Sequence, residues 1–132
     1  MVNDLDVLNK LSNRIHRDNV NAGWWNSYVS KSLSDSDKNR EFLDLTLATK
    51  MLLIITELSE AVEGFRKDEM DDHLPDRKSV EVELADAMIR IFDIAGAMQL
   101  DLSGAIKDKM EYNAKRADHK PENRAKKNGK RF

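Results

Sequence analysis

The apolar residues of this chain recur at the spacing of helices. Leu8, Leu11 and Ile15 lie three and four residues apart, which predicts a first helix that ends before Gly23. A longer apolar pattern predicts a second helix from about Asp37 to Lys67. Its apolar positions include Phe42, Leu45, Leu52, Ile55, Leu58, Val62 and Phe65.

Two further helices are predicted after a polar segment, residues 68–78, which contains a proline and is typical of a loop. Ser79 can cap a third helix from Val80 to about Met98, and Asp101 can cap a fourth from Leu102 to about Asp118. We therefore expect one all-α domain over residues 1–119, a bundle of four to five helices, followed by a basic C-terminal tail, residues 120–132. The second and third helices are apolar on more than one face, which predicts burial at a subunit interface as well as in the core of one chain.

Composition narrows the class of protein. The 132 residues suit a single core, and the net charge of −2 argues against nucleic-acid binding by bulk electrostatics. The chain has no cysteine, which excludes disulfides and thiolate metal sites. Its longest apolar run, residues 51–55, is too short to span a membrane, and the first residues lack a signal-type apolar segment. We expect a cytoplasmic protein without a membrane partner.

Two pairs of acidic residues interrupt the apolar stripes. Glu57 and Glu60 lie three residues apart on the second predicted helix, and Glu83 and Asp86 repeat that spacing on the third. If the helices pack antiparallel, the two pairs can face each other. Such a group of carboxylates is costly to bury unless protons or a cation neutralise it. Oxygen ligands favour Mg²⁺, with Mn²⁺ as a possible substitute.

Other interpretations of these acids remain open. A Glu-x-x-Glu pair is common on solvated helix faces, and Glu63, with Arg66 and Lys67 one turn away, is typical of that class. Asp93 lies two turns beyond Asp86 and could be a further ligand or an ion-pair partner of Arg90, with the partner role favoured. A di-iron bundle needs Glu-x-x-His pairs, and none of the three histidines has that spacing to a core acid.

The ordered set of motifs resembles the MazG-like all-α nucleoside triphosphate pyrophosphohydrolases, of phage and bacterial type. The family signature is similar to the order of acids found here, which is Glu57-x-x-Glu60, a gap of 22 residues and then Glu83-x-x-Asp86. The segments AGWW, TELSEAVEGFRK, VELADAMIRIFDIA, KMEYNAKRADHK and NGKRF are also similar, so the resemblance covers roughly residues 22–132. Thr56 departs from the pattern, because many members carry a further Glu there.

The resemblance implies Mg²⁺-dependent hydrolysis of a nucleoside triphosphate to the monophosphate and pyrophosphate, with a role in house-cleaning or nucleotide-pool control. It also implies a homo-oligomer, a dimer or a tetramer, whose active site is built in the bundle and in some members across the interface. The residues Glu57, Glu60, Glu83 and Asp86 match the metal positions, and Lys109, Asn113 and Arg116 match positions that contact phosphate or sugar.

Several residues receive roles in this hypothesis. Glu57 or Glu60 could act as the general base. One of Trp24 and Trp25 is expected to stack on a base and the other to be structural, and Tyr112 could line the base pocket or pack. The alternative function is a non-catalytic helical interaction module whose basic tail binds nucleic acid or a protein partner. That alternative leaves the inward acids unexplained.

Overall fold

All regular elements among the described residues are helices, which confirms the predicted all-α class. The computed structural model describes residues 6–26 and 36–130. The elements are α1 (Asp6–Asn21), α3 (Ser36–Lys67), α4 (Ser79–Ala97), α5 (Leu102–Lys115), the 3₁₀ turn η1 (Ala117–His119) and α6 (Pro121–Arg124). No helix within these ranges is long and apolar enough to cross a membrane.

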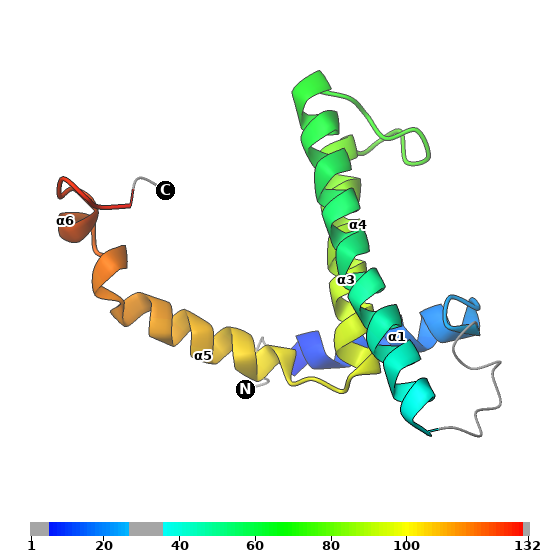
Figure 1. Cartoon of the computed structure of the whole chain (residues 1–132). Helices are drawn as coiled ribbons and strands as arrows, with labels where there is room; N and C mark the ends of the chain where they lie inside the picture. The colour runs from blue at the N-terminus through cyan, green and yellow to red at the C-terminus, as the bar shows by residue number, and fades with distance from the viewer. Residues whose placement is uncertain (1–5, 27–35, 131–132) are drawn as a thin grey trace.

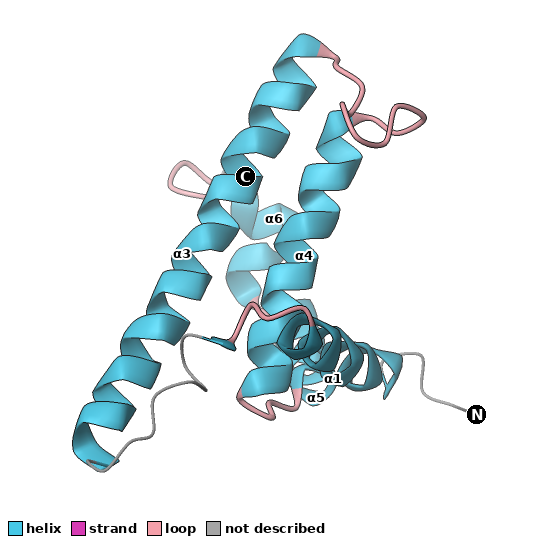
Figure 2. Cartoon of the chain, turned by 90° about the vertical axis from the view of Figure 1, so that its right-hand side faces the viewer, coloured by secondary structure: helices cyan, strands magenta, loops and turns pink. Residues whose placement is uncertain are grey.

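The helices α3 and α4 form an antiparallel pair (Figures 1 and 2). The predicted loop, residues 68–78, connects them and is stabilised by Asp71, whose Oδ1 accepts hydrogen bonds from the backbone N–H groups of His73 and Leu74 at 2.9 and 2.7 Å. Gly64 lets the two helices approach closely at this end, since a Cβ there would collide with the side chain of Ser79. This close contact fixes how α3 and α4 lie against each other at the loop end of the pair.

One of the two predicted helix caps is confirmed and the other is wrong. Asp101 caps α5 as predicted, because its side chain accepts the backbone N–H of Gly104 at 2.9 Å. The prediction of Ser79 as the cap of α4 is wrong by one residue. Lys78 precedes the helix, and its backbone N–H donates to Glu81 Oε2 at 3.1 Å.

The helix α1 crosses the C-terminal half of α4 (Figure 2). Gly96 makes this crossing possible, because a Cβ there would lie 2.6 Å from both the backbone oxygen of Ser12 and the Cβ of His16. A small buried core of Trp25, Leu47 and Ile94 lies beside the crossing. It joins the turn after α1 to the pair α3–α4.

The helix α5 does not complete a compact bundle. It begins against α1, where Ser103 Oγ accepts the backbone N–H of Asn9 at 3.2 Å, and then runs away from α3 and α4 within the described chain (Figure 1). It ends at Lys115, earlier than predicted, and the short elements η1 and α6 follow. Asp118 joins these elements through ion pairs with Arg116 and Lys130 at 2.6 and 2.8 Å. The tail is therefore partly helical.

Candidate functional site

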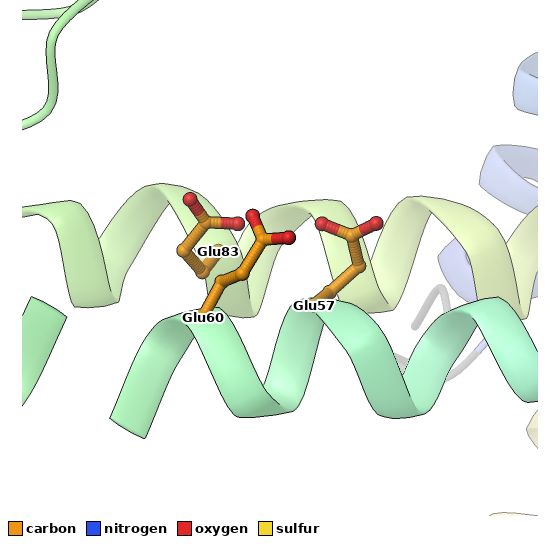
Figure 3. A group of neighbouring side chains, drawn as sticks. All are labelled: Glu57, Glu60 and Glu83. Carbon is orange, nitrogen blue, oxygen red and sulfur yellow. The ribbon is translucent and has the colours of Figure 1, made fainter. Parts of the chain in front are cut away.

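Three of the four predicted acids meet between the two long helices. Glu57 and Glu60 project from α3 and Glu83 projects from α4, so that one carboxylate oxygen of each lies within 4.8 Å of the others. Figure 3 shows the three side chains on the same side of the helix pair. Glu57 is buried, Glu83 is half-buried and Glu60 is exposed. Antiparallel packing places the two motifs at the same height, so three of the four predicted acids converge.

Asp86 stands beside this group rather than inside it. It lies one turn beyond Glu83 on α4, is exposed, and lines a cavity whose other lining residues include Arg90. Asp86 is thus a neighbour of Glu83 along the helix and part of the cavity lining.

Two of the acids, Glu83 and Asp86, have a raised pKa. Desolvation and then the charges of Glu60 and Glu57 raise the pKa of Glu83 above its ordinary value. Desolvation and the charge of Glu57 raise the pKa of Asp86, and Arg90 opposes this effect in part. A bound cation would offset both causes, because it neutralises the charge that burial and the neighbouring carboxylates disfavour.

Arg90 of α4 is the cationic partner of the buried Glu57. Its Nε and Nη2 lie 2.7 and 2.6 Å from the same oxygen, Glu57 Oε1. The other carboxylate oxygen of Glu57 is not used by this ion pair. The sequence analysis favoured Asp93 as the partner of Arg90, and that prediction is wrong.

Asp93 instead anchors the turn after α1. It is buried, and its carboxylate accepts the indole N–H of Trp25 at 3.0 and 3.2 Å and lies 2.8 Å from His16 Nδ1. Lys50 of α3 adds a charge at 3.7 Å from Asp93 Oδ2 and lies 4.2 Å above the centre of the Trp25 ring. Asp93 is therefore held by partners from α1, the turn after it and α3, and it is not among the three acids that converge.

A cavity of about 700 Å³ lies between the end of α1, the turn that carries Trp24, and the helices α3 and α4, and its lining includes Asp86 and Arg90, the partner of Glu57. This volume is in the range of small-molecule sites. The lining combines apolar side chains, two cations, two acids and uncharged polar groups: Asn19, Trp24, Phe42, Leu45, Thr46, Thr49, Lys50, Leu53, Asp86, Ile89, Arg90 and Asp93. One end of a ligand could thus lie among apolar groups while the other end reaches the acids.

The two adjacent tryptophans have different surroundings. Trp25 is buried and bonded to Asp93, whereas Trp24 is 72% exposed and lines the cavity. Trp25 therefore stabilises the crossing of α1 over the helix pair. Trp24 presents a free ring face at the cavity, where a planar ligand could stack.

The predicted phosphate-binding residues lie on α5 or, for Arg116, directly after it, away from the acids of the same chain. Tyr112 is exposed, with Lys109 Nζ 4.9 Å and Arg116 Cζ 5.7 Å from its ring centre. Arg116 also forms a bidentate pair with Asp118 at 2.9 and 2.6 Å, which raises the pKa of Arg116. The side-chain oxygen of Asn113 is buried and has no hydrogen-bond partner in the described structure. Within one chain these residues and the acids do not meet (Figure 1).

Sequence reasoning missed two cations of the site. Arg90 lies seven residues after Glu83, and Lys50 lies seven residues before Glu57, so each shares a helix face with an acid. The spacing of seven residues could therefore have predicted that Arg90 and Lys50 lie near the acids. The link from Asp93 to His16 and Trp25 had no local signal, because these residues are 77 and 68 positions apart.

The donor set fits a hard divalent cation. The three glutamates offer only carboxylate oxygens, at least one oxygen of Glu57 is outside its ion pair, and Asp86 lies close by. Comparisons of the chain with protein-family models, curated proteins and solved structures found no match. The assignment of a function consequently depends on this geometry and on the motif pattern.

Proposed function

We propose that this protein is a Mg²⁺-dependent nucleotide pyrophosphohydrolase of MazG-like type, which converts a nucleoside triphosphate to the monophosphate and pyrophosphate. The observation that carries the proposal is the convergence of Glu57, Glu60 and Glu83 from facing helices, with their oxygens within 4.8 Å. The resemblance of the acidic motifs to that family supports the same conclusion.

Glu57, Glu60 and Glu83 would hold the metal, with Asp86 at the cavity side. A bound Mg²⁺ supplies charge neutralisation at the phosphate oxygens and makes a water molecule more acidic. Mn²⁺ has similar oxygen preferences and is expected to substitute. Arg90 fixes the buried Glu57, so its carboxylate is held in place before any ligand binds.

Glu60 is the better candidate for the general base. It is exposed and makes no ion pair with any described residue, whereas Glu57 is buried against Arg90. In the proposed reaction the water oxygen bonds to a phosphorus of the α–β bridge, Glu60 takes its proton, and the bridging P–O bond breaks. The products are a nucleoside monophosphate and pyrophosphate.

The cavity would take the nucleoside end of the substrate. Trp24 could stack on the base, and Asp86 and Arg90 also line the cavity, where the phosphates would lie. Lys50 and Arg90 contribute positive charge on the route that the phosphates would follow. An exposed aromatic ring together with these two cations suits a ligand that is aromatic at one end and anionic at the other.

Lys109, Asn113 and Arg116 would contact the phosphates or the sugar from another copy of the chain. Their own α5 runs away from α3 and α4, so they do not reach the acids of their own chain. The proposal therefore includes a homo-oligomer in which α5 of one subunit serves the acids of a neighbour.

The direct test is pyrophosphate release from a panel of ribo- and deoxynucleoside triphosphates, with Mg²⁺, with Mn²⁺ and with EDTA. We expect metal-dependent formation of equal amounts of monophosphate and pyrophosphate, and the ranking of the panel identifies the base and sugar. Absence of turnover with both metals would overturn the proposal. The helical interaction module would then be the better description of the protein.

A further inference from the structure

The cavity that Trp24 lines also holds three uncharged polar side chains, to which the proposed reaction assigns no role. They are Asn19, near the end of α1, and Thr46 and Thr49 on α3. A base that stacks on Trp24 presents its polar edge to the other groups that line the same cavity. These three side chains are consequently the candidates for recognition of the base.

The turn that follows α1 ties Asn19 to Trp24. The backbone oxygen of Asn19 accepts the backbone N–H of Trp24 at 3.1 Å. Gly23 makes this turn possible, because residues that carry a Cβ rarely adopt its φ of +88°. One short stretch of chain thus holds a ring for stacking and a side-chain amide next to each other.

The side-chain amide of Asn19 is half-buried and makes no hydrogen bond with the described residues. An amide offers N–H donors and a carbonyl acceptor side by side, a pattern that pairs with the edge of a base. Because the amide can turn over, it can pair with an amino group beside a ring nitrogen or with a carbonyl beside an N–H. Asn19 can therefore hold the edge of a base, but it does not by itself choose between these two kinds of edge.

The two threonines differ from Asn19 because their hydroxyl protons are already used. Thr46 Oγ1 donates to the backbone oxygen of Phe42 at 2.8 Å. Thr49 Oγ1 donates to the backbone oxygen of Leu45, also at 2.8 Å. A hydroxyl that donates in this way keeps only lone pairs for a ligand. The cavity therefore has two hydrogen-bond acceptors on α3, from residues three positions apart on one helix face.

An acceptor in the cavity distinguishes bases by the group at their pairing edge. Cytosine and adenine present an exocyclic amino group, which donates hydrogen bonds, whereas uracil and hypoxanthine present a carbonyl oxygen at that position. The two hydrogens of an amino group can bond to the Asn19 side-chain oxygen and to a threonine oxygen at once. A carbonyl oxygen at the same place meets a threonine oxygen as acceptor against acceptor, unless the hydroxyl gives up its bond to the helix.

We infer that Asn19, Thr46 and Thr49 select a nucleotide whose base carries an exocyclic amino group, cytosine or adenine, over one with a carbonyl oxygen in its place. The base stacks on Trp24, Asn19 pairs with its edge, and the threonine oxygens accept hydrogen bonds from its amino group. This inference rests on the proposed function, because it takes the cavity as the site of the nucleoside, and it adds the class of base.

The test is the binding of nucleoside monophosphates to the full-length chain, measured by isothermal titration calorimetry in Mg²⁺ and in EDTA. The probes are two matched pairs, dCMP with dUMP and dAMP with dIMP. Within each pair an amino group is exchanged for a carbonyl oxygen, and the adjacent ring nitrogen gains a proton. We expect the amino member of each pair to bind about 10-fold or more tightly, because the carbonyl member leaves an acceptor of the cavity unpaired.

Variants of the threonines test the same preference. Thr46→Val and Thr49→Val keep the shape of the side chain and remove the acceptor. In the double variant the preference within each pair should fall to about 2-fold or less, mainly through weaker binding of dCMP and dAMP. Thr56→Val is the matched control, because Thr56 also donates to a backbone oxygen of α3, at 2.7 Å, and does not line the cavity. It should keep the preference of the wild type.

The amide has its own pair of variants. Asn19→Ala should weaken the binding of all four probes by about 10-fold, since both kinds of base edge lose their hydrogen bonds to the amide. Asn13→Ala is the control, because Asn13 is exposed on the same helix and does not line the cavity. It should bind the probes like the wild type.

Equal binding within either pair would overturn the inference, and so would the absence of binding by all four probes. An unchanged preference in the double threonine variant would also contradict it. Failure of the enzymatic proposal is a separate result, because binding of a monophosphate needs no hydrolysis. Pyrophosphate release without the preference would keep the enzyme and remove the selection of the base. The preference without pyrophosphate release would keep the base site and remove the enzyme.

Discussion

Arg90 of α4 holds Glu57 of α3 through a single carboxylate oxygen, with its Nε and Nη2 2.7 and 2.6 Å from Oε1. This ion pair joins the two helices that carry the acidic motifs. The positive charge of Arg90 also offsets the negative charge of Glu57, which is the one buried acid of the group. The stability of the helix pair and the geometry of the candidate metal site consequently depend on the same contact.

Replacing Arg90 with alanine should destabilise the metal-free protein by about 1–3 kcal/mol, because Glu57 is left buried without its partner. The measurement is urea unfolding in EDTA. The double variant Arg90→Ala/Glu57→Gln should recover part of the loss, since the uncompensated charge is gone. Equal stability of Arg90→Ala and the wild type would show that the pair contributes nothing.

Glu60→Gln and Asp86→Asn should each lower pyrophosphate release by about 10²-fold or more while the fold survives. Glu63→Gln is the matched control, because Glu63 lies one turn from Glu60 and pairs with Arg66 and Lys67 at the surface. Its activity should equal that of the wild type. Full activity in both Glu60→Gln and Asp86→Asn would remove these residues from the site.

The raised pKa of Glu83 predicts a pH dependence of stability in the metal-free protein. Because the folded state binds this proton more tightly than the unfolded state, stability increases as pH falls from above the raised pKa towards the ordinary value for Glu. At neutral pH Glu83 is charged, so the cost of its desolvation and its repulsion by Glu60 and Glu57 are both present. Glu83→Gln removes this charge and should raise the melting temperature in EDTA.

The same variant tests the metal. Mg²⁺ should raise the melting temperature of the wild type, because it neutralises the acids, and it should raise that of Glu83→Gln less. Melting curves at several pH values, with EDTA and with Mg²⁺, provide the comparison. If Glu83→Gln melts below the wild type in EDTA at neutral pH, the repulsion among the acids is not the dominant effect.

The adjacent tryptophans should give opposite phenotypes. Trp24→Ala removes an exposed ring at the cavity and should weaken substrate binding by about 1–3 kcal/mol, seen as a higher KM, with little change in stability. Trp25→Phe loses the hydrogen bonds to Asp93 and should lower the free energy of unfolding by about 1–3 kcal/mol. An unchanged KM in Trp24→Ala would exclude stacking on this residue.

Mixed oligomers can reveal whether α5 serves a neighbouring subunit. Glu60→Gln and Lys109→Ala should each be inactive or weak alone, and mixing them should restore up to about a quarter of wild-type activity if acids and α5 come from different copies of a dimer. Glu60→Gln mixed with Asp86→Asn is the control and should stay inactive, because no site then has all its acids. No gain in the first mixture would assign α5 to its own chain or remove it from the site.

Local patterns in the sequence were sufficient for the helices and for the acids. The period of the apolar residues predicted α3 and α4, and the polar loop between them lies where the structure has it. The spacing of three residues places Glu57 and Glu60 on one helix face whatever the rest of the chain does. Cap chemistry predicted Asp101 correctly, because a cap bonds to residues of its own turn.

The tertiary structure alone decided which distant residues meet. Arg90 of α4 pairs with Glu57 rather than Asp93 because of how α3 lies against α4. Asp93 contacts His16 and Trp25 because the crossing at Gly96 sets how α1 lies on α4. Partners on different helices depend on the register of packing, which no short pattern encodes. The direction of α5 also depends on tertiary packing, because α5 contacts α1 at its beginning and then runs away from the helix pair. The sequence by itself thus determined the helices and the acids that share a face, and the packing determined their partners.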